Sequence, residues 1–160
     1  MGGLAIARAL HVLGVVLWIG GVAFVTTVLL PTVRRLEDPA RRVAVFEEVE
    51  SRFARQARAT TLLVGASGFW MMVELDAWPR LLVPAYWWIH GMIAVWLLFT
   101  LLLFLLEPLF LHRWFLARAR QEPERTFARI ERMHRVLLVV SLATLLGAVA
   151  GAHGLLLFAG

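Results

Sequence analysis

The sequence predicts an all-α fold, an integral membrane four-helix bundle in a single domain, and three observations support that class. Of the 160 residues, 61% are hydrophobic and only 17% are charged. In soluble domains about half of the residues are hydrophobic and about 25% are charged. The apolar residues form four long blocks, and none alternates as a transmembrane β-strand does. Because a spanning helix needs about 20 apolar residues, this length accommodates four spans and no separate catalytic domain. A soluble globular enzyme and a disordered chain are both excluded.

Each predicted helix follows from one apolar block, and the four spans cover residues 4–31, 57–75, 84–111 and 135–158. The second span is short and borrows residues from its flanks, while the third is long enough to imply tilt. The two connections, 32–56 and 112–134, are charged, but their apolar residues recur at helical spacing. We therefore expect both connections to be helical extensions of the spans.

Arginine placement predicts the orientation of the bundle. All 16 basic residues are Arg, and 14 of them lie in or at the edge of the two connections. Only Arg8 and Arg80 remain for the opposite side. Because basic loops stay in the cytoplasm, we expect both connections to be cytoplasmic and both termini to lie outside.

The composition also indicates the surroundings of the protein. The net charge of +5 reflects membrane topology, so we expect the lipid bilayer as a partner and no nucleic acid. The chain has no cysteine, which excludes disulfides and thiolate metal sites. A short, Arg-only chain without a sorting signal is typical of a multi-pass protein of the bacterial inner (plasma) membrane. Whether it forms a homodimer stays open.

The two halves of the chain resemble each other weakly, which favours a tandem duplication of a helical hairpin. The shared order of residue types is His, Trp and Pro: His11, Trp18 and Pro31 in the first half, His90, Trp96 and Pro108 in the second. Such repeats are related by an axis along the membrane normal, which would put His11 and His90 at matching depth. Chance similarity between apolar helices is the alternative.

Five histidines lie in or beside the spans, and ionisable residues there are costly and often functional. At 1.5 Å per residue, His11, His90 and His153 can share one layer on the outer side. His112 and His134 form a second layer at the cytoplasmic ends of the third and fourth spans. Two layers of histidines are what two b-type haems require, because each iron takes one neutral imidazole from each of two facing helices.

The sequence therefore predicts one or two haem b groups. We expect His11 and His90 to ligate an outer haem, with His153 as a supporting or substitute ligand, and His112 and His134 to ligate an inner one. Residues placed to contact the haems follow the same layers: Trp18 and Gly14 on the face of His11, Arg8 near the outer propionates, Arg113 and Arg135 near the inner ones. The alternative is that each histidine is a packing or interfacial residue.

Glu107 is the other unusual ionisable residue, because it interrupts an apolar run and precedes Pro108. A proline lacks the backbone N–H, so the helix ladder around residue 104 should loosen and admit water. Glu107 is thus a candidate catalytic residue that relays protons to a cofactor or quinone. The alternative is an ion pair with Arg58 or Arg135.

The string LHVLGVVLWIGG, from Leu10 to Gly21, resembles the first helix of two related sets of small membrane proteins. These are the copper-resistance D (CopD) type and the HemJ-type protoporphyrinogen oxidases, which are four-helix haem proteins. The HemJ-type third helix carries Trp-x-His-x-Lys, and this chain has Trp88-Ile89-His90-Gly91-Met92, with Met92 in place of Lys. The resemblance implies a haem or copper fold and leaves the reaction, and whether the protein is an enzyme, open.

Three functions are compatible with these observations. The first is a membrane b-type cytochrome that exchanges electrons with a quinone, a small oxidant or a redox partner protein. The second is copper handling of the CopD type, because imidazoles and thioethers suit Cu(I) and Met71, Met72 and Met92 lie near the outer half. The third is a non-catalytic accessory subunit. The two layers of histidines favour the cytochrome.

Overall fold

The computed structural model describes residues 2–155, except the side chains of residues 110–113 and 116. This part of the chain is helical and contains no strand, as predicted. In chain order the elements are α1 (Gly2–Phe24), η1 (Val25–Leu29), α2 (Leu30–Leu36), α3 (Pro39–Glu74), η2 (Trp78–Leu82), η3 (Pro84–Tyr86), α4 (Trp87–Leu101), η4 (Leu102–Leu111), α5 (His112–Gln121) and α6 (Pro123–Ala152). Here η1 and η4 are π-helical, and η2 and η3 are 3₁₀ turns.

Three helical stretches are long and apolar enough to cross a membrane, namely Gly2–Leu36, Pro84–Leu109 and Pro123–Ala152. They contain the first predicted span and most of the third and fourth. The second predicted span lies in the last half of α3, where Thr60, Thr61 and Ser67 interrupt the apolar run. Helix α3 is therefore not among these three stretches, and the count of four spans stays a prediction.

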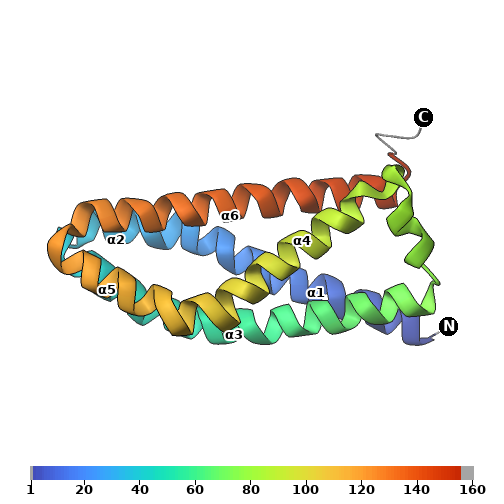
Figure 1. Ribbon diagram of the computed structural model, residues 1–160, viewed down its shortest axis with the longest axis horizontal. Helices are drawn as coiled ribbons and strands as arrows, with labels where there is room; N and C mark the ends of the chain where they lie inside the picture. The colour runs from blue at the N-terminus through green and yellow to red at the C-terminus, as the bar shows by residue number, and fades with distance from the viewer. Residues whose placement is uncertain (1, 156–160) are drawn as a thin grey trace.

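The long helices run back and forth between two ends of the molecule (Figure 1). The turn from α2 to α3 and the turn from α5 to α6 lie together at one end, and α3 and α6 both begin there with a proline in the first helical turn, a position that proline suits. The beginning of α1 and the end of α6 lie at the other end. Because the predicted connections are concentrated at the first end, the arginines collect there.

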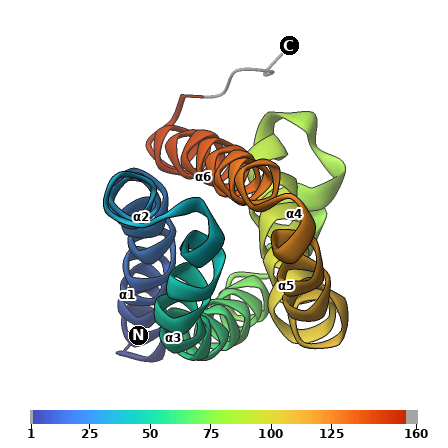
Figure 2. The ribbon, with the colours of Figure 1, turned by 90° about the vertical axis from the view of Figure 1, so that its left-hand side faces the viewer.

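Helix α6 contacts helices from both halves of the chain. Helix α1 packs along α3, α4 packs along α6, and α6 also contacts α1 and α3. The end view in Figure 2 shows α6 above, α1 to α3 on one side, and α4 and α5 on the other. Between them the buried apolar side chains form two clusters, one around Trp18, Phe99 and Leu138 and one around Phe46, Phe127 and Ile130.

Close approach of α1 and α3 depends on Gly21. A Cβ atom added there would overlap the ring of Phe53 on α3, whereas one added to the neighbouring Gly20 would meet nothing within 4 Å. The ring of Phe53 therefore occupies the space that the missing side chain leaves. This contact fixes the first half of α3 against α1.

The helix containing Pro108 widens into a π-helix, and the chain changes direction between α4 and α5 (Figure 1). Residues 102–111 form the π-helix η4, with Pro108 inside it. In a π-helix the N–H of residue 108 would donate to the carbonyl five residues earlier, at Leu103, but proline has no N–H. The sequence predicted a loosened ladder around residue 104, so the position is nearly right, and the form that it takes is a π-helix with the carbonyl of Leu103 left without its helical donor.

Candidate acid cavity and histidine sites

A cavity of about 110 Å³ lies inside the bundle, where α1, α3, η4, α5 and α6 meet. Its wall is mostly apolar and includes the flat rings of Trp18, Phe46 and Phe99. Four ionisable side chains also line it: Glu47 and Glu50 from α3, Glu107 from η4 and His134 from α6. Carboxylates in an apolar wall are costly and mark functional sites. The cavity is therefore the candidate site with the strongest chemical character among the described residues.

Arg58 ties α3 to the π-helix η4 at the edge of this cavity. Its Nε donates to the carbonyl of Leu103 at 2.9 Å, and its Nη2 donates to Oε2 of Glu107 at 2.5 Å. One guanidinium thus satisfies the carbonyl that Pro108 leaves without a donor and neutralises the adjacent carboxylate. The ion pair with Arg58, one of the two interpretations of Glu107, is present.

Glu50 is the site residue that the sequence pattern did not single out. It lies in α3 ahead of the predicted second span, and burial raises the pKa of its carboxyl to about 7. That value of the pKa already includes the smaller effects of the negative charges at Glu107 and Glu47, which raise it, and of the positive charge of Arg58, which lowers it. The signal in the sequence is spacing: Glu50 stands one turn from Phe46 and from Phe53, on the apolar face of α3.

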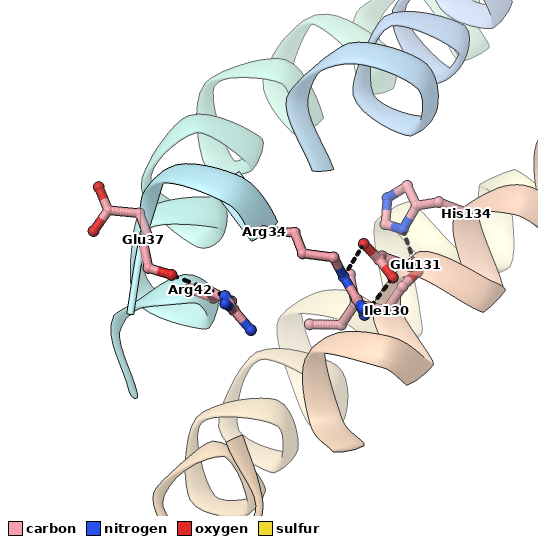
Figure 3. A network of polar contacts seen from close by, with 6 residues as sticks. All are labelled: Arg34, Glu37, Arg42, Ile130, Glu131 and His134. Carbon is pink, nitrogen blue, oxygen red and sulfur yellow. Dashed lines mark hydrogen bonds and ion pairs between the residues drawn. The ribbon is translucent and has the colours of Figure 1, made fainter. Parts of the chain in front are cut away.

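His134 lies with 9% of its surface exposed, on the cavity wall. Its Nδ1–H donates to the carbonyl of Ile130 at 3.0 Å (Figure 3), and its ring meets Phe46 edge to face at 5.4 Å. Close by, Arg34 of α2 forms a two-pronged ion pair with Glu131, at 2.8 and 2.7 Å. These contacts fix the orientation of the His134 ring and hold the start of α6 against α2.

The outer histidines are held in different ways. The Nδ1 of half-buried His11 lies 3.2 Å from the carbonyl oxygen of Val64 and 3.1 Å from Oγ of Ser67, both on α3. His153 is exposed, and its Nδ1–H donates to the carbonyl of Val149 at 2.8 Å. His90 is exposed on α4. Within the described residues, no hydrogen bond or ring contact joins His11, His90 and His153 to one another.

Side chains of neighbouring helices fill the space beside three glycines. Val64 of α3 packs on Gly14, which was expected beside a haem, and the rings of Trp87 and Trp88 pack on Gly147 and Gly151. These glycines allow close helix packing in the structure.

The other residues that were expected to contact a haem lie at the cavity, at the surface or outside the described residues. Trp18 is 3% exposed, meets Phe99 edge to face at 4.8 Å, and has an indole N–H with no hydrogen-bond partner. Arg8 and Arg135 are exposed. The side chains of His112 and Arg113 lie outside the described residues.

An open groove runs along the outside of the same bundle wall, between α4, η4 and α6. Its volume is about 480 Å³, and Arg129 and Arg132 lie at its edge. Three residues line both the groove and the cavity: Leu102, Met133 and Leu137. The two spaces are therefore separated by a single layer of side chains.

Metal ligation by three or more groups finds no support in the described part of the chain. No three His, Asp or Glu side chains there come close enough together to hold one metal ion, although a haem iron needs only two protein ligands.

Comparisons of the chain with protein families, with curated proteins and with solved structures found no match.

Proposed function

We propose that this protein is a membrane b-type cytochrome, with a redox role toward a quinone, a small oxidant or a partner protein. One observation carries the proposal. His11, His134 and His153 each direct Nδ1 at a backbone carbonyl oxygen, so the neutral ring holds its lone pair on Nε2. Histidines that ligate metals are oriented in this way, with the second nitrogen hydrogen-bonded to a carbonyl or carboxylate.

The donor chemistry of the chain fits haem b, which supplies one-electron redox chemistry when bound. His11 and His90 would hold an outer haem and His112 and His134 an inner one, with His153 as a supporting ligand. Arg8 on the outer side and Arg113 and Arg135 on the inner side supply positive charge for propionates. The acid cavity is smaller than the pockets of about 300 Å³ or more that hold cofactors, so it serves beside a haem rather than as its pocket.

The chain's own residues orient the ligands and hold charge. Val64 and Ser67 of α3 fix the ring of His11, and the carbonyl of Ile130 and the ring of Phe46 fix that of His134. Arg58 stabilises the charge of Glu107 at the edge of the cavity.

The membrane placement is part of the same proposal. We infer four spans in the bacterial inner membrane, with the arginine-rich end in the cytoplasm and both termini outside. The three apolar stretches and the two turns that lie together at one end support it.

The optical spectrum of the purified protein tests the cytochrome. We expect the absorption of a low-spin b-type haem, with an α band near about 560 nm after reduction. His11→Ala, His90→Ala or His134→Ala should each remove the low-spin signal of one haem, whereas exposed His153→Ala should perturb the spectrum less. An unchanged spectrum in all the variants would show the ligand assignment to be wrong.

The same preparation distinguishes the other functions. A colourless protein that binds Cu(I) would instead support copper handling, with imidazoles and thioethers as ligands. A protein that binds neither haem nor copper would be an accessory subunit.

A further inference from the structure

The acid cavity contains a polar group that needs a partner. The indole N–H of Trp18 is buried on the cavity wall and has no hydrogen-bond partner among the described residues. An unsatisfied buried donor costs about 1–3 kcal/mol, and a cavity with several polar groups holds water rather than staying dry. At about 30 Å³ per molecule, a volume of about 110 Å³ accommodates three or four waters, which can bridge the indole to the carboxylates.

Three carboxyl groups and one histidine line the cavity. Glu47 and Glu50 of α3 and Glu107 of η4 line the cavity, with His134 facing them from α6. The guanidinium of Arg58 donates to Glu107 and to the carbonyl of Leu103. Glu50 therefore lies in an apolar wall beside negative charges, without an arginine of its own among the described contacts.

We propose that Glu50 is a proton-binding site, which takes up and releases one proton through the water of the cavity while Glu107 keeps its ion pair with Arg58. The transferred species is a proton, and the bond that forms or breaks is the O–H bond of the Glu50 carboxyl. This assigns proton exchange to Glu50 rather than to Glu107, and it goes beyond the cytochrome because it needs no haem. The pKa near 7 puts the exchange in the physiological range.

An infrared titration tests the proposal on the full protein in lipid nanodiscs. The carbonyl band of a protonated carboxylic acid should disappear with a midpoint near pH 7. Glu50→Gln should remove that band. Glu48→Gln, which changes an exposed glutamate two residues away on the same helix, is the matched control and should leave it in place.

Two further variants test the surroundings of Glu50. Glu107→Gln removes a negative charge, so it should lower the midpoint, and Arg58→Gln removes a positive charge, so it should raise it, each by roughly tenfold in proton affinity. A parent midpoint below about pH 6, or a band that survives Glu50→Gln, would overturn the assignment, and the parent titration decides even if a variant fails to fold. Absence of haem from the protein would overturn the cytochrome and leave this result unaffected.

Discussion

Glu50 and Glu107 are two carboxylates of one cavity in opposite environments. Glu107 has an arginine at hydrogen-bond distance, whereas Glu50 has a desolvating wall and two negative neighbours. Two carboxyl groups in such different environments can take different roles in one site. At the scale of the residue, they differ in the burial of Glu50 and in the guanidinium beside Glu107.

Gly21 gives a second prediction at the residue scale. Gly21→Ala puts a methyl group into the ring of Phe53, so it should lower the free energy of unfolding by about 1–3 kcal/mol, as overpacking does. Gly20→Ala, at the adjacent open position, is the control and should change stability by less than about 1 kcal/mol. Denaturant unfolding in detergent micelles measures both. Equal effects at the two positions would mean that the Phe53 contact does not constrain α1 and α3.

At the scale of the element, the π-helix η4 is stabilised from another helix. Its free carbonyl at Leu103 accepts from Arg58, which lies on α3. A wide helical turn around a proline is unfavourable by itself, because a hydrogen bond is missing. The guanidinium replaces that bond and holds Glu107 at the same time.

A double-mutant cycle tests this coupling. Arg58→Ala should destabilise the protein by about 2–4 kcal/mol, because it strands a carboxylate and a carbonyl. In the Pro108→Ala background the loss should be smaller by about 1 kcal/mol, since residue 108 then has an N–H for the carbonyl of Leu103. Strictly additive losses would show that the two residues do not share that carbonyl. Arg42, which bonds only the carbonyl of Glu37 in the turn region, supplies a control substitution to Ala.

At the scale of the whole molecule, the arginine-rich turns lie together at one end. Reporter fusions at residue 45 and residue 120 should report the cytoplasm, and a fusion at the C-terminus should report the outside, because basic segments are retained. A fusion at residue 83, between η2 and η3, is the internal control and should report the outside as well. An outward-facing residue 120 would reverse the assignment of every histidine to its layer.

Much of this architecture follows from composition and periodicity. The all-helical fold and three apolar stretches were predicted because they depend on local sequence, and the Arg58–Glu107 pair was one of two interpretations. The loosening near residue 104 was predicted, but its π-helical form and the bond from Arg58 were not, because Arg58 lies 45 residues away in sequence from Leu103. The exposure of His90 depends on how α4 is rotated, which the packing of Trp87 and Trp88 on the glycines of α6 determines. The burial of Glu50 was not predicted, because it depends on which helices pack against α3.

The cavity and the outer groove share one wall of side chains, and this wall lies between the interior of the bundle and the membrane-facing surface. Leu102, Met133 and Leu137 line both spaces, and Met133 is an unbranched thioether that changes rotamer readily. Proton exchange between a lipid-soluble molecule in the groove and water in the cavity would then require only a rotamer change of Met133. Helices α1, α3 and η4, which Phe53 and Arg58 fasten together, need not move. A partition that opened in this way would do so on the timescale of a rotamer change, which is far shorter than that of a helix displacement.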